Sequence, residues 1–480
     1  MPRHSPRSLK ARNRHPMNHA QIREYIEAHV TRQPGTKIQY GHPSPRFWSP
    51  LSLPPADVAA MRVKNRGLVL YLHIPFCPKT DPPACGFCLF AREDYTGYEA
   101  VEVYLSYMLR ELEMYAAACE GEELSCIYFG GGTPNMLKPH DYGRLMSAIR
   151  ARFRIAPGAE ITLEGVPELF TEDRLGAMVD AGITRISIGA QQLKSELLRY
   201  SGRHHNAGHV LRGVARAHDL GLAVNVDLIC GWFDQTTEDL EHDLRLLCAM
   251  RPESIVVHPL TLAGPSHFVQ EQARLPSSAE TCVTFLRGRS YLEEHGYWAS
   301  SAVDYMLSSP PRGPAEVHYL RSYRDILRHD RLGVGYGANS LFAGGPGRPG
   351  RTWRNVDKFE GYYKAIDAGR LPILEGFCFD DVDLVLLYVL KGLEGTPYLR
   401  ADRYAEDFGG DLARDFAEHW TVLREMGWLT VHDGEYRIVG EGVFYLPVIQ
   451  RCIANDRNDE LRAAQRASRF RVHLPQANTV

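Results

Sequence analysis

The chain has 480 residues, a formal net charge of −3 and 24% charged residues. These values predict a globular protein and give no electrostatic reason to expect binding to nucleic acid or to a membrane surface. The basic start, residues 1–17, lacks the apolar segment of a signal peptide, and no stretch of the sequence is apolar over the length of a membrane span. We therefore expect a cytoplasmic protein whose residues 1–17 form a disordered tail.

Three cysteines follow the first predicted strand, residues 68–76. Cys77, Cys85 and Cys88 lie in the segment CPKTDPPACGFC, whose prolines disfavour a helix. Iron–sulfur clusters prefer soft thiolate ligands, and three of them leave one iron of a four-iron cluster open. A structural zinc site would need a fourth ligand, for which His73 is the nearest candidate, and a disulfide is disfavoured in a reducing cytoplasm. The spacing therefore predicts a metal or cluster site.

The remaining cysteines are scattered through the chain. Free cysteines are among the most buried residue types, so these are expected to pack against apolar neighbours. They are Cys119, Cys126, Cys230, Cys248, Cys282, Cys378 and Cys452.

After the cysteine loop, short β-branched or apolar runs alternate with amphipathic segments. Regular succession of strand and helix is typical of parallel βα units. The sequence therefore predicts an α/β protein with a partial or full (βα) barrel of the TIM type. The expected strands begin at Cys126, Glu160, Arg185, Ala223 and Ser254, and the expected helices cover 101–118, 140–153, 172–180 and 207–220.

Polar and glycine residues fall at the ends of these strands. They are the cysteine loop, the turn 130–133, Glu164, Gln191 and Asp227. Each alone has a plain structural alternative, a tight turn or a hydrogen-bonded polar group. The carboxyl ends of barrel strands meet on one rim, where such enzymes place their chemistry, so the common placement predicts a single site.

Several motifs occur in a fixed order: YLHIPFC (71–77), IYFGGGTPNML (127–137), ITLEGVPELF, RISIGAQQL, SGRHHN and NVDLICG. Together they resemble the radical S-adenosylmethionine (SAM) enzymes related to oxygen-independent coproporphyrinogen III oxidase. The resemblance covers about residues 71–262 and continues weakly through LGVGYGANS and GYYKAIDAGRLP. It implies a radical SAM barrel over residues 67–345.

The resemblance also implies the cofactors. The three loop cysteines Cys77, Cys85 and Cys88 would ligate a [4Fe-4S] cluster whose open iron binds SAM. Glycines let a backbone come close to such a ligand, and a carboxylate suits its hydroxyls. The first SAM would be contacted by Tyr71, Phe87, Gly131, Gly132, Thr133 and Glu164.

A second SAM is implied beside the first, so that one or two molecules are expected. Gln191, Arg203 and Asp227 match the positions that contact it, and Thr261 and Asn339 are looser matches to further cofactor contacts. The family cleaves SAM with one electron to a 5′-deoxyadenosyl radical, which abstracts hydrogen from an unreactive carbon.

The leading expectation from this resemblance is methyl or methylene transfer, that is methylation or cyclopropanation, from a second SAM to a small aromatic metabolite. The first alternative is coproporphyrinogen III dehydrogenase or another tetrapyrrole- or haem-processing radical SAM enzyme. The second alternative is a haem chaperone. The expected partners are a small-molecule substrate and a reductant such as flavodoxin or ferredoxin.

The sequence departs from the family pattern in three places. Seven residues separate the first two cysteines where the family usually has three, so the loop must bulge. Cys88 is followed by Leu89 and Phe90, whereas coproporphyrinogen oxidases carry a further cysteine there, which weighs against porphyrinogen decarboxylation. Cys230 stands where relatives commonly have tyrosine and precedes the aromatic pair 232–233, so the substrate side looks altered. Cys230 is a candidate catalytic thiol, with an inert buried thiol as the alternative.

The two ends of the chain complete the predicted organisation. Residues 18–66 form an N-terminal extension that the shorter haem-chaperone relatives generally lack, and 346–377 form a connecting helical region. Residues 378–455 are expected to form a small α+β winged-helix-like domain, because two helices precede a hairpin with an Asp433–Gly434 turn. Its acidic surface favours a lid or packing role over DNA binding. Residues 456–480 are expected to form a frayed helix and a tail.

Overall fold

The structure is a computed structural model that describes residues 16–31, 42–63, 65–119, 121–262, 266–313, 317–345, 349–395 and 398–472. The tail predicted for residues 1–17 lies outside the described residues, apart from Pro16 and Met17. None of the helices in the described ranges has the length and apolar character needed to cross a membrane.

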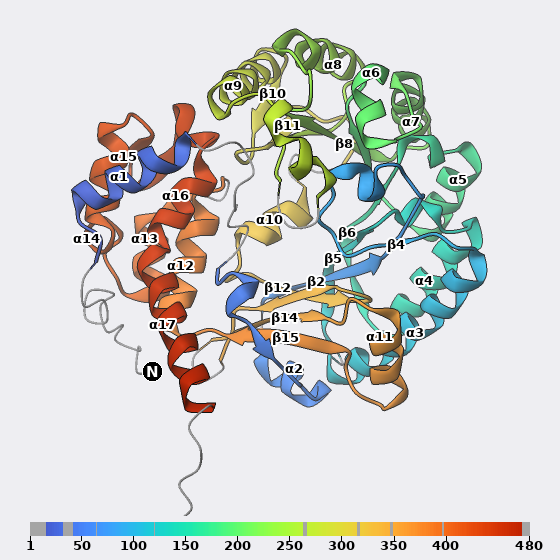
Figure 1. Ribbon diagram of the computed structural model, residues 1–480. Coiled ribbons are helices and arrows are strands. Elements are labelled where there is room, and N and C mark those ends of the chain that lie inside the picture. Colours follow the sequence, from blue (N-terminus) through green and yellow to red (C-terminus); the bar gives the residue numbers. More distant parts are fainter. Residues whose placement is uncertain are drawn as a thin grey trace, which may run out of the picture.

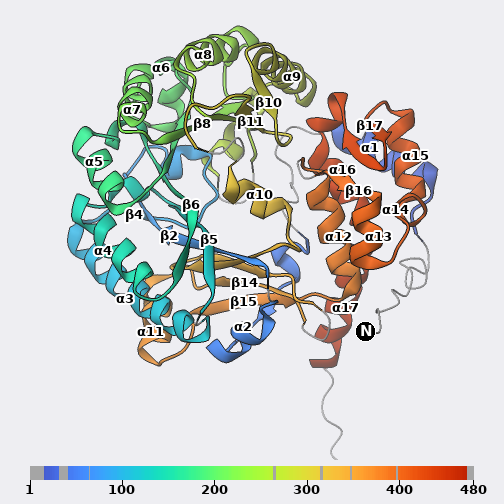
Figure 2. The same cartoon turned by 180° about the vertical axis from the view of Figure 1, so that it is seen from behind.

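A 13-stranded sheet forms the centre of the molecule, and six consecutive parallel strands build its curved middle (Figure 1). They are β2 (Gly67–Ile74), β5 (Glu123–Gly131), β6 (Arg154–Gly165), β7 (Arg185–Gln191), β8 (Ala223–Cys230) and β9 (Ser254–Pro259). The outside is covered by α3 (Tyr98–Ala118), α4 (Pro139–Arg150), α5 (Glu172–Ala181), α7 (Ala207–Asp219), α8 (Thr237–Met250) and α9 (Ser278–Glu294), as Figures 1 and 2 show. This partial (βα) barrel confirms the predicted fold class.

Side chains of the parallel strands alternate between the helices and the barrel interior. Leu68, Leu70 and Leu72 of β2 are fully buried in the main apolar core, whereas Tyr71 and His73 lie on the opposite face of the strand. The same alternation in the other strands produces an apolar outer layer and an interior that carries polar side chains. The candidate site is built from this interior face.

The barrel is open, because antiparallel strands continue the sheet at both ends of the parallel set. One end continues from β9 through β11 (Asp304–Leu307) to β10 (Tyr297–Ala299). At the other end β12 (His329–Val334) adds one more strand parallel to β2, and the antiparallel strand β13 (Asn339–Phe342) follows. The short helix α10 (His318–Arg324) lies between the two ends of the curved sheet (Figure 1).

The region predicted as a helical connection, 346–377, contains two strands of the main sheet. β14 (Arg351–Asn355) pairs with β13, and β15 (Ile373–Cys378) pairs with β14. Only α11 (Phe359–Asp367), which contacts α3, is helical as expected. The prediction of a purely helical connection is wrong, because Trp353 and its neighbours pair along the sheet edge and bury their apolar side chains there.

The N-terminal extension reaches two parts of the molecule. Helix α1 (His19–Val30) contacts α15 (Ala417–Glu425) and α16 (Leu446–Ile453) near the C-terminus. Further along, β1 (Ser49–Pro50) pairs with β15 and α2 (Pro55–Met61) packs on α3. The extension therefore joins the barrel to the C-terminal region.

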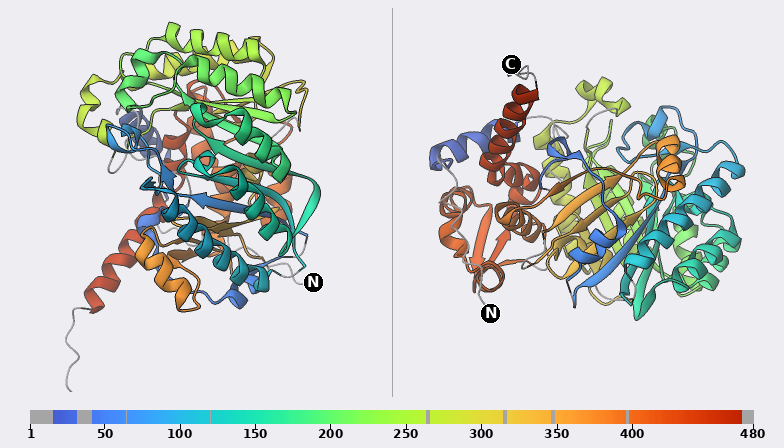
Figure 3. Two further views of the ribbon diagram at one scale, coloured as in Figure 1. Left: turned by 90° about the vertical axis from the view of Figure 1, so that its right-hand side faces the viewer. Right: turned by 90° about the horizontal axis from the view of Figure 1, so that it is seen from below.

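The C-terminal region forms a group of helices beside the barrel (Figure 3). It contains α12 (Asp381–Gly392), α13 (Ala401–Phe408), α14 (Leu412–Asp415), α15 and α16. A three-stranded sheet is formed by β16 (Leu399–Arg400), β18 (Glu435–Ile438) and β17 (Leu429–His432). The turn between β17 and β18 has φ of 48° at Asp433 and 74° at Gly434, as a two-residue hairpin of type I′ requires.

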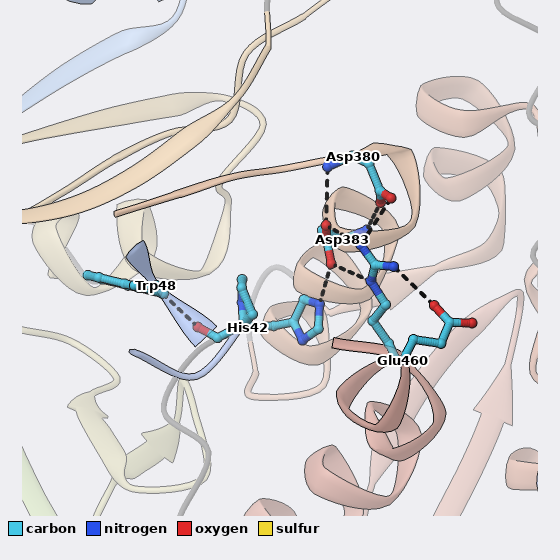
Figure 4. A network of polar contacts seen from close by, with 7 residues as sticks. His42, Trp48, Asp380, Asp383 and Glu460 are labelled. Atoms are coloured by element: carbon cyan, nitrogen blue, oxygen red, sulfur yellow. Dashed lines mark hydrogen bonds and ion pairs between the residues drawn. The ribbon is translucent and has the colours of Figure 1, made fainter. Parts of the chain in front are cut away.

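The last described element is α17 (Asn455–Val472), which is anchored in a buried ionic network (Figure 4). The Asp383 carboxylate accepts hydrogen bonds from His42 Nε2 at 3.0 Å and from Arg457 Nε and Nη2, both at 2.9 Å. Burial opposes ionisation of this carboxyl, but the bonds from His42 and Arg457 hold its pKa below its usual range. α17 is the helix expected in this last segment, and Arg457 fixes its first turn to α12.

Candidate cluster and cofactor site

The three cysteines lie together on the loop that follows β2. Cys77 ends the short strand β3 (Phe76–Cys77), which pairs with β4 (Glu93–Asp94), and the Cys77 carbonyl accepts from the Tyr95 N–H at 2.9 Å. Cys85 lies in the 3₁₀ turn Pro83–Gly86, and the Cys88 N–H donates to the Ala84 carbonyl at 3.1 Å. All three thiols are half-buried, so they are held by the fold and still reachable.

The long first spacing is accommodated by a bulge that the fold supports. Ala84 and Cys85 both have φ above 50°, a left-handed conformation that costs non-glycine residues about 1–2 kcal/mol each. The Thr80 hydroxyl spans the bulge, accepting from the Cys85 N–H at 3.0 Å and donating to the Pro82 carbonyl at 2.9 Å. The bulge also rests on Gly202, where any side chain would collide with the Asp81 backbone.

Each thiol has a hydrogen-bond donor nearby. The Thr133 hydroxyl donates to Cys77 Sγ at 3.5 Å and Arg203 Nη1 to Cys85 Sγ at 3.9 Å. A backbone N–H from Phe90 lowers the pKa of the Cys88 thiol, although burial raises it overall. Burial likewise raises the pKa of Cys77 to about 11. Such thiols are neutral until a metal displaces their protons, and the donors then stabilise the thiolates.

This arrangement fits a [4Fe-4S] cluster in the chemistry of its donors. Within the described ranges, no group of three or more His, Cys, Asp or Glu side chains converges on the position of one metal ion. A cluster distributes its cysteine ligands over separate iron atoms, so its thiols need not converge on one point. Three accessible thiols, each with a hydrogen-bond donor nearby, suit ligation of three separate irons. His73 is hydrogen-bonded to the Ala91 carbonyl at 2.7 Å and is not needed as a fourth ligand.

The glycine turn at the end of β5 packs against the protein itself. A Cβ on Gly132 would lie 2.6 Å from the Pro75 carbonyl oxygen and 2.7 Å from that of Phe76. On Gly131, which has φ of 108°, it would lie 2.6 Å from the His73 ring. The glycines are therefore needed to bring β5 against the segment that carries Cys77. Their contact with SAM stays a prediction.

Glu164 lies at the end of β6 among tyrosines. Its carboxylate accepts from the Tyr128 hydroxyl at 2.5 Å, and burial raises its pKa to about 7. Tyr71 is stacked on Tyr128 with ring centroids 6.2 Å apart, and Tyr319 of α10 stacks on the same ring at 3.8 Å. The carboxyl remains partly exposed, so it is available to the hydroxyls of a ligand.

Asp227 belongs to a hydrogen-bonded network on the opposite side. Its carboxylate accepts from Ser187 Oγ at 2.8 Å and from Asn225 Nδ2 at 2.7 Å, and Asn225 Oδ1 accepts from Ser254 Oγ at 2.7 Å. Burial raises the pKa of Asp227 despite these bonds. The network holds the carboxyl in one orientation while part of it stays exposed.

Gln191 and Arg203 connect the two sides. β7 has a register shift between Gly189 and Gln191, and Gln191 has φ of 64°. Such irregularities in a strand re-aim a side chain at a site. Arg203 donates to the Gly189 carbonyl at 2.5 Å as well as to Cys85, so it ties the end of β7 to the cysteine loop.

Comparison with known proteins places this site in a family. A family model described as "Radical SAM superfamily" matches residues 71–247. The "Heme chaperone HemW" of Escherichia coli (strain K12) is 32% identical over 291 residues, which cover 60% of this chain and 74% of HemW. The chain belongs to the radical SAM superfamily. Within it, the chain is related to HemW and to oxygen-independent coproporphyrinogen III oxidase.

The oxidase relatives match more of this radical SAM protein. The "Oxygen-independent coproporphyrinogen III oxidase" of Salmonella typhimurium is 25% identical over 407 residues, covering 82% of this chain and 87% of the oxidase. The structure of coproporphyrinogen III oxidase (HemN) from Escherichia coli superimposes with a TM-score of 0.74 and 23% identity, over 86% of this chain and 96% of that one. The fold is therefore shared well beyond the cofactor core.

These relatives overturn the leading functional expectation. Methyl or methylene transfer to a small aromatic metabolite is wrong, because the relatives that match are named as a haem chaperone and a coproporphyrinogen oxidase. The alternative, a tetrapyrrole-related radical SAM protein, fits them better. The radical SAM part of the expectation, with a [4Fe-4S] cluster and SAM, is confirmed.

Some predicted site residues lie away from the radical SAM site. Cys230 is buried on the outer, apolar side of β8, and burial raises the pKa of its thiol, so it is not placed for catalysis. Trp232 and Phe233 are also buried, and both contact Phe268, which packs against Gly86 in the cysteine loop. This aromatic pair therefore packs against the segment that supports the cysteine loop.

The remaining predictions have weaker structural support. Phe87 is half-buried against Trp232, with ring centroids 5.3 Å apart, and Thr261 is half-buried just after β9. Asn339 is exposed at the start of β13, although its backbone lies against Gly333 beside Tyr71. Their contacts with SAM stay predictions. Cys378, expected to be buried, is exposed.

Sequence reasoning missed several residues of the interior. Helix α10 places Tyr319 on Tyr128, and its His318 and Tyr319 N–H groups donate to the Glu160 carboxylate at 3.2 and 3.3 Å. Glu160 also pairs with the buried Arg185 at 3.2 Å. For strand residues such as Arg185 a signal was present, because polar residues alternate with apolar ones in AVNVDLIC and RISIG, as in a strand with one polar face; for α10 there was none.

Proposed function

We propose that this protein is a radical SAM protein whose substrate is a tetrapyrrole, a porphyrin or haem. The observation that carries the proposal is the extent of the match to coproporphyrinogen III oxidase, which covers 82% of this chain and so reaches beyond the residues 71–247 of the radical SAM match. The cofactor core alone is common to radical SAM proteins with many different substrates. The substrate of such a protein binds next to the cofactor core. Similarity of the regions around the core therefore supports a similar class of substrate.

The chain's own residues define how the cofactors would be held. Cys77, Cys85 and Cys88 would ligate the [4Fe-4S] cluster, which when bound supplies the electron that cleaves SAM. Thr133 and Arg203 donate hydrogen bonds toward two of the sulfurs and so stabilise their thiolate form.

Glu164 is the group best placed for the ribose of SAM. Tyr128 orients the carboxylate through a short hydrogen bond, the Gly131 backbone also donates to it, and the partly exposed carboxyl can be reached by a ligand hydroxyl. Tyr71 and Tyr319 stack on Tyr128 and limit the access of water to this carboxyl. A buried carboxyl of this kind forms a stronger hydrogen bond than one in water.

We propose that one SAM occupies this site. Arg203 is already engaged with Gly189 and Cys85, and Asp227 with Ser187 and Asn225. These side chains have the roles of holding the cysteine loop and of facing the substrate, which leaves them less free to bind a second SAM. The reductant is proposed to be a flavodoxin or ferredoxin.

The substrate is proposed to be a tetrapyrrole that is processed without the oxidase's fourth cysteine. Cys88 is followed by Leu89 and Phe90, which are 41% and 68% exposed, so no further thiol lies next to the cluster loop there. This departure favours haem or another porphyrin over decarboxylation of coproporphyrinogen III.

The test is an anaerobic assay of reconstituted, dithionite-reduced protein with SAM, run with haem, with coproporphyrinogen III and with neither. We expect 5′-deoxyadenosine to form at the rate at which the tetrapyrrole is consumed. Its formation should be faster with haem than with coproporphyrinogen III. Formation of 5′-deoxyadenosine at one rate in all three assays, without tetrapyrrole binding, would contradict it.

A haem chaperone is the second candidate, favoured by the 32% identity to HemW. In that case the Soret band of bound haem stays intact throughout the same assay, and little 5′-deoxyadenosine forms. The two candidates therefore differ in turnover and agree on the ligand.

A further inference from the structure

His258 lies on the interior face of β9, at the open end of the barrel. Ser254 occupies the same face, since its hydroxyl bonds to Asn225 within the Asp227 network. Side chains on one face of a strand recur every second residue, so Val256 and His258 follow Ser254 on the interior face. The alternate residues Ile255 and Val257 are buried in the outer apolar core.

The pairing of β9 with β8 places His258 near Asp227, in the barrel interior. In the β8–β9 pairing His258 is opposite Ile229, and Asp227 is opposite Val256. The imidazole is close enough to Asp227 for its charge to act on that carboxyl, where it favours ionisation. His258 thus faces the same interior as Glu164, from the other side of the barrel.

The His258 side chain is exposed although its strand lies between two neighbours. A histidine on an interior face is usually buried and hydrogen-bonded. Across the described residues, no hydrogen bond or ion pair to the His258 ring is found, and the side chain is exposed. A ring nitrogen without a partner is available to a ligand.

The residues next to His258 on the same face of the sheet are apolar. Ile229, Leu260 and Leu262 are nearly fully buried and pack together in one cluster with Phe87 beside them. An exposed imidazole beside apolar side chains, here with the half-buried Phe87 next to this apolar cluster, is a setting in which a ring nitrogen can coordinate haem iron.

We propose that His258 is the axial ligand of the iron of a haem bound in this site. The inference rests on the proposed function, because it assumes that the protein binds a tetrapyrrole. It adds a specific residue and a specific ligand, the iron-containing form. It also explains why a histidine is exposed on an interior face whose other polar side chains are hydrogen-bonded to one another.

The experiment compares ferric haem with metal-free protoporphyrin IX as probes of the reconstituted full chain. Wild type, His258→Ala and the control His204→Ala, another exposed histidine on the loop after β7, are titrated with each probe. Absorption and electron paramagnetic resonance spectra report the iron ligand. His258→Ala is expected to shift the haem Soret band, to lose the imidazole signature and to bind haem about tenfold more weakly or worse.

Three further results belong to the expected outcome. Added imidazole restores the wild-type haem spectrum in His258→Ala. The affinity for protoporphyrin IX, which has no iron to coordinate, stays within twofold of wild type. His204→Ala leaves both probes unchanged.

The inference is overturned if the haem spectrum of His258→Ala equals that of wild type, or if His204→Ala produces the shift instead. It is also overturned if His258→Ala weakens protoporphyrin IX as much as haem, which would assign His258 to packing. These outcomes leave tetrapyrrole binding intact. Failure of wild type to bind either probe would overturn the proposed function along with the inference.

Discussion

The two sides of the barrel opening are built by different kinds of interaction. On the cofactor rim, which is the ends of β2, β5 and β6, backbone segments touch directly, and Gly132 has no room for a methyl group beside Pro75 and Phe76. On the facing rim, which is the ends of β7, β8 and β9, hydrogen-bonded side chains such as Asp227 and Asn225 fill the interior. Side chains can change without moving the backbone. The shape of the cofactor rim is therefore fixed by the backbone, and we expect the side chains of the facing rim to determine which substrate binds.

The largest effect is expected on the cofactor rim from Cys85→Ala. The protein should fold and lose the cluster, because two thiols of the loop cannot replace three corners of the ligand set. Iron and sulfide analysis and the visible spectrum of the reconstituted protein measure the loss. Cys378→Ala, which removes an exposed cysteine on β15, is the control and should retain the full cluster content.

Gly132→Ala should have the next largest effect. The added methyl group meets two backbone carbonyls at 2.6 and 2.7 Å, so β5 or the Cys77 segment must move. Overpacking of this kind costs about 1–3 kcal/mol, and we expect a lower melting temperature and a reduced cluster content. Gly143→Ala in α4 is the matched control, because nothing lies within 4 Å of its Cβ position. Equal melting temperatures of the two variants would argue against the tight approach.

Glu164→Gln tests the ligand side of the cofactor rim. Removing the charge of a carboxylate that accepts a ligand hydroxyl weakens the hydrogen bond, and we expect SAM affinity to fall about tenfold. The cluster spectrum should be unchanged. Isothermal titration with SAM measures the affinity, and a wild-type value in the variant would remove Glu164 from the cofactor contacts.

The same carboxyl predicts a dependence on pH. Burial raises its pKa from 4.5 to about 7, so the folded protein keeps this proton after the unfolded chain has lost it. The contribution of Glu164 to the free energy of unfolding is full below about pH 4.5 and is lost as the pH rises through about 7. Glu164→Gln cannot ionise, and its melting temperature relative to wild type should rise between pH 5 and pH 8. A constant difference over this range would contradict the raised pKa.

Arg203→Met should have the smallest effect, because Arg203 links the two rims by hydrogen bonds that other groups support. Losing its bonds to Gly189 and Cys85 should speed the loss of iron to a chelator about twofold to tenfold. Arg199→Met, at an exposed arginine four residues earlier, is the control. A wild-type rate in Arg203→Met would show that the cysteine loop does not depend on the facing rim.

The contrast between the rims also explains what the sequence predicts. The order of strands and helices follows from hydrophobic periodicity, which is local, and the cysteine loop and the glycine turn are short motifs. Glu164 and Asp227 could be placed at strand ends from the sequence because the rule for barrels requires only their position along a strand. These features lie mainly on the cofactor rim.

The missed features depend on contacts between distant segments. Tyr319 stacks on Tyr128 only because α10 enters the barrel, and nothing in the sequence near Tyr319 specifies that position. β14 and β15 pair in chain order after β13, but they join the main sheet only through β12, and β15 is completed by β1 from the N-terminal extension. Arg457 could not be assigned to Asp383 because the pairing depends on how α17 docks.

Cys230 shows how strand register decides between two readings of one residue, a catalytic thiol and an inert buried one. It ends a predicted strand on the rim, but the alternation along β8 turns it to the outer core while Asp227 and Ile229 take the interior face. Counting in steps of two from Asp227 would have placed Cys230 outside. The register of a strand therefore decides whether a residue at its end can take part in a site.

The most direct test of the account is the electron paramagnetic resonance spectrum of the reduced, reconstituted protein with and without SAM. We predict a [4Fe-4S] signal whose g-values change when SAM is added, because three cysteines leave one iron open to it, and the signal should be absent in Cys85→Ala. A cluster signal that SAM leaves unchanged, or that persists in Cys85→Ala, would contradict the assignment of the three cysteines.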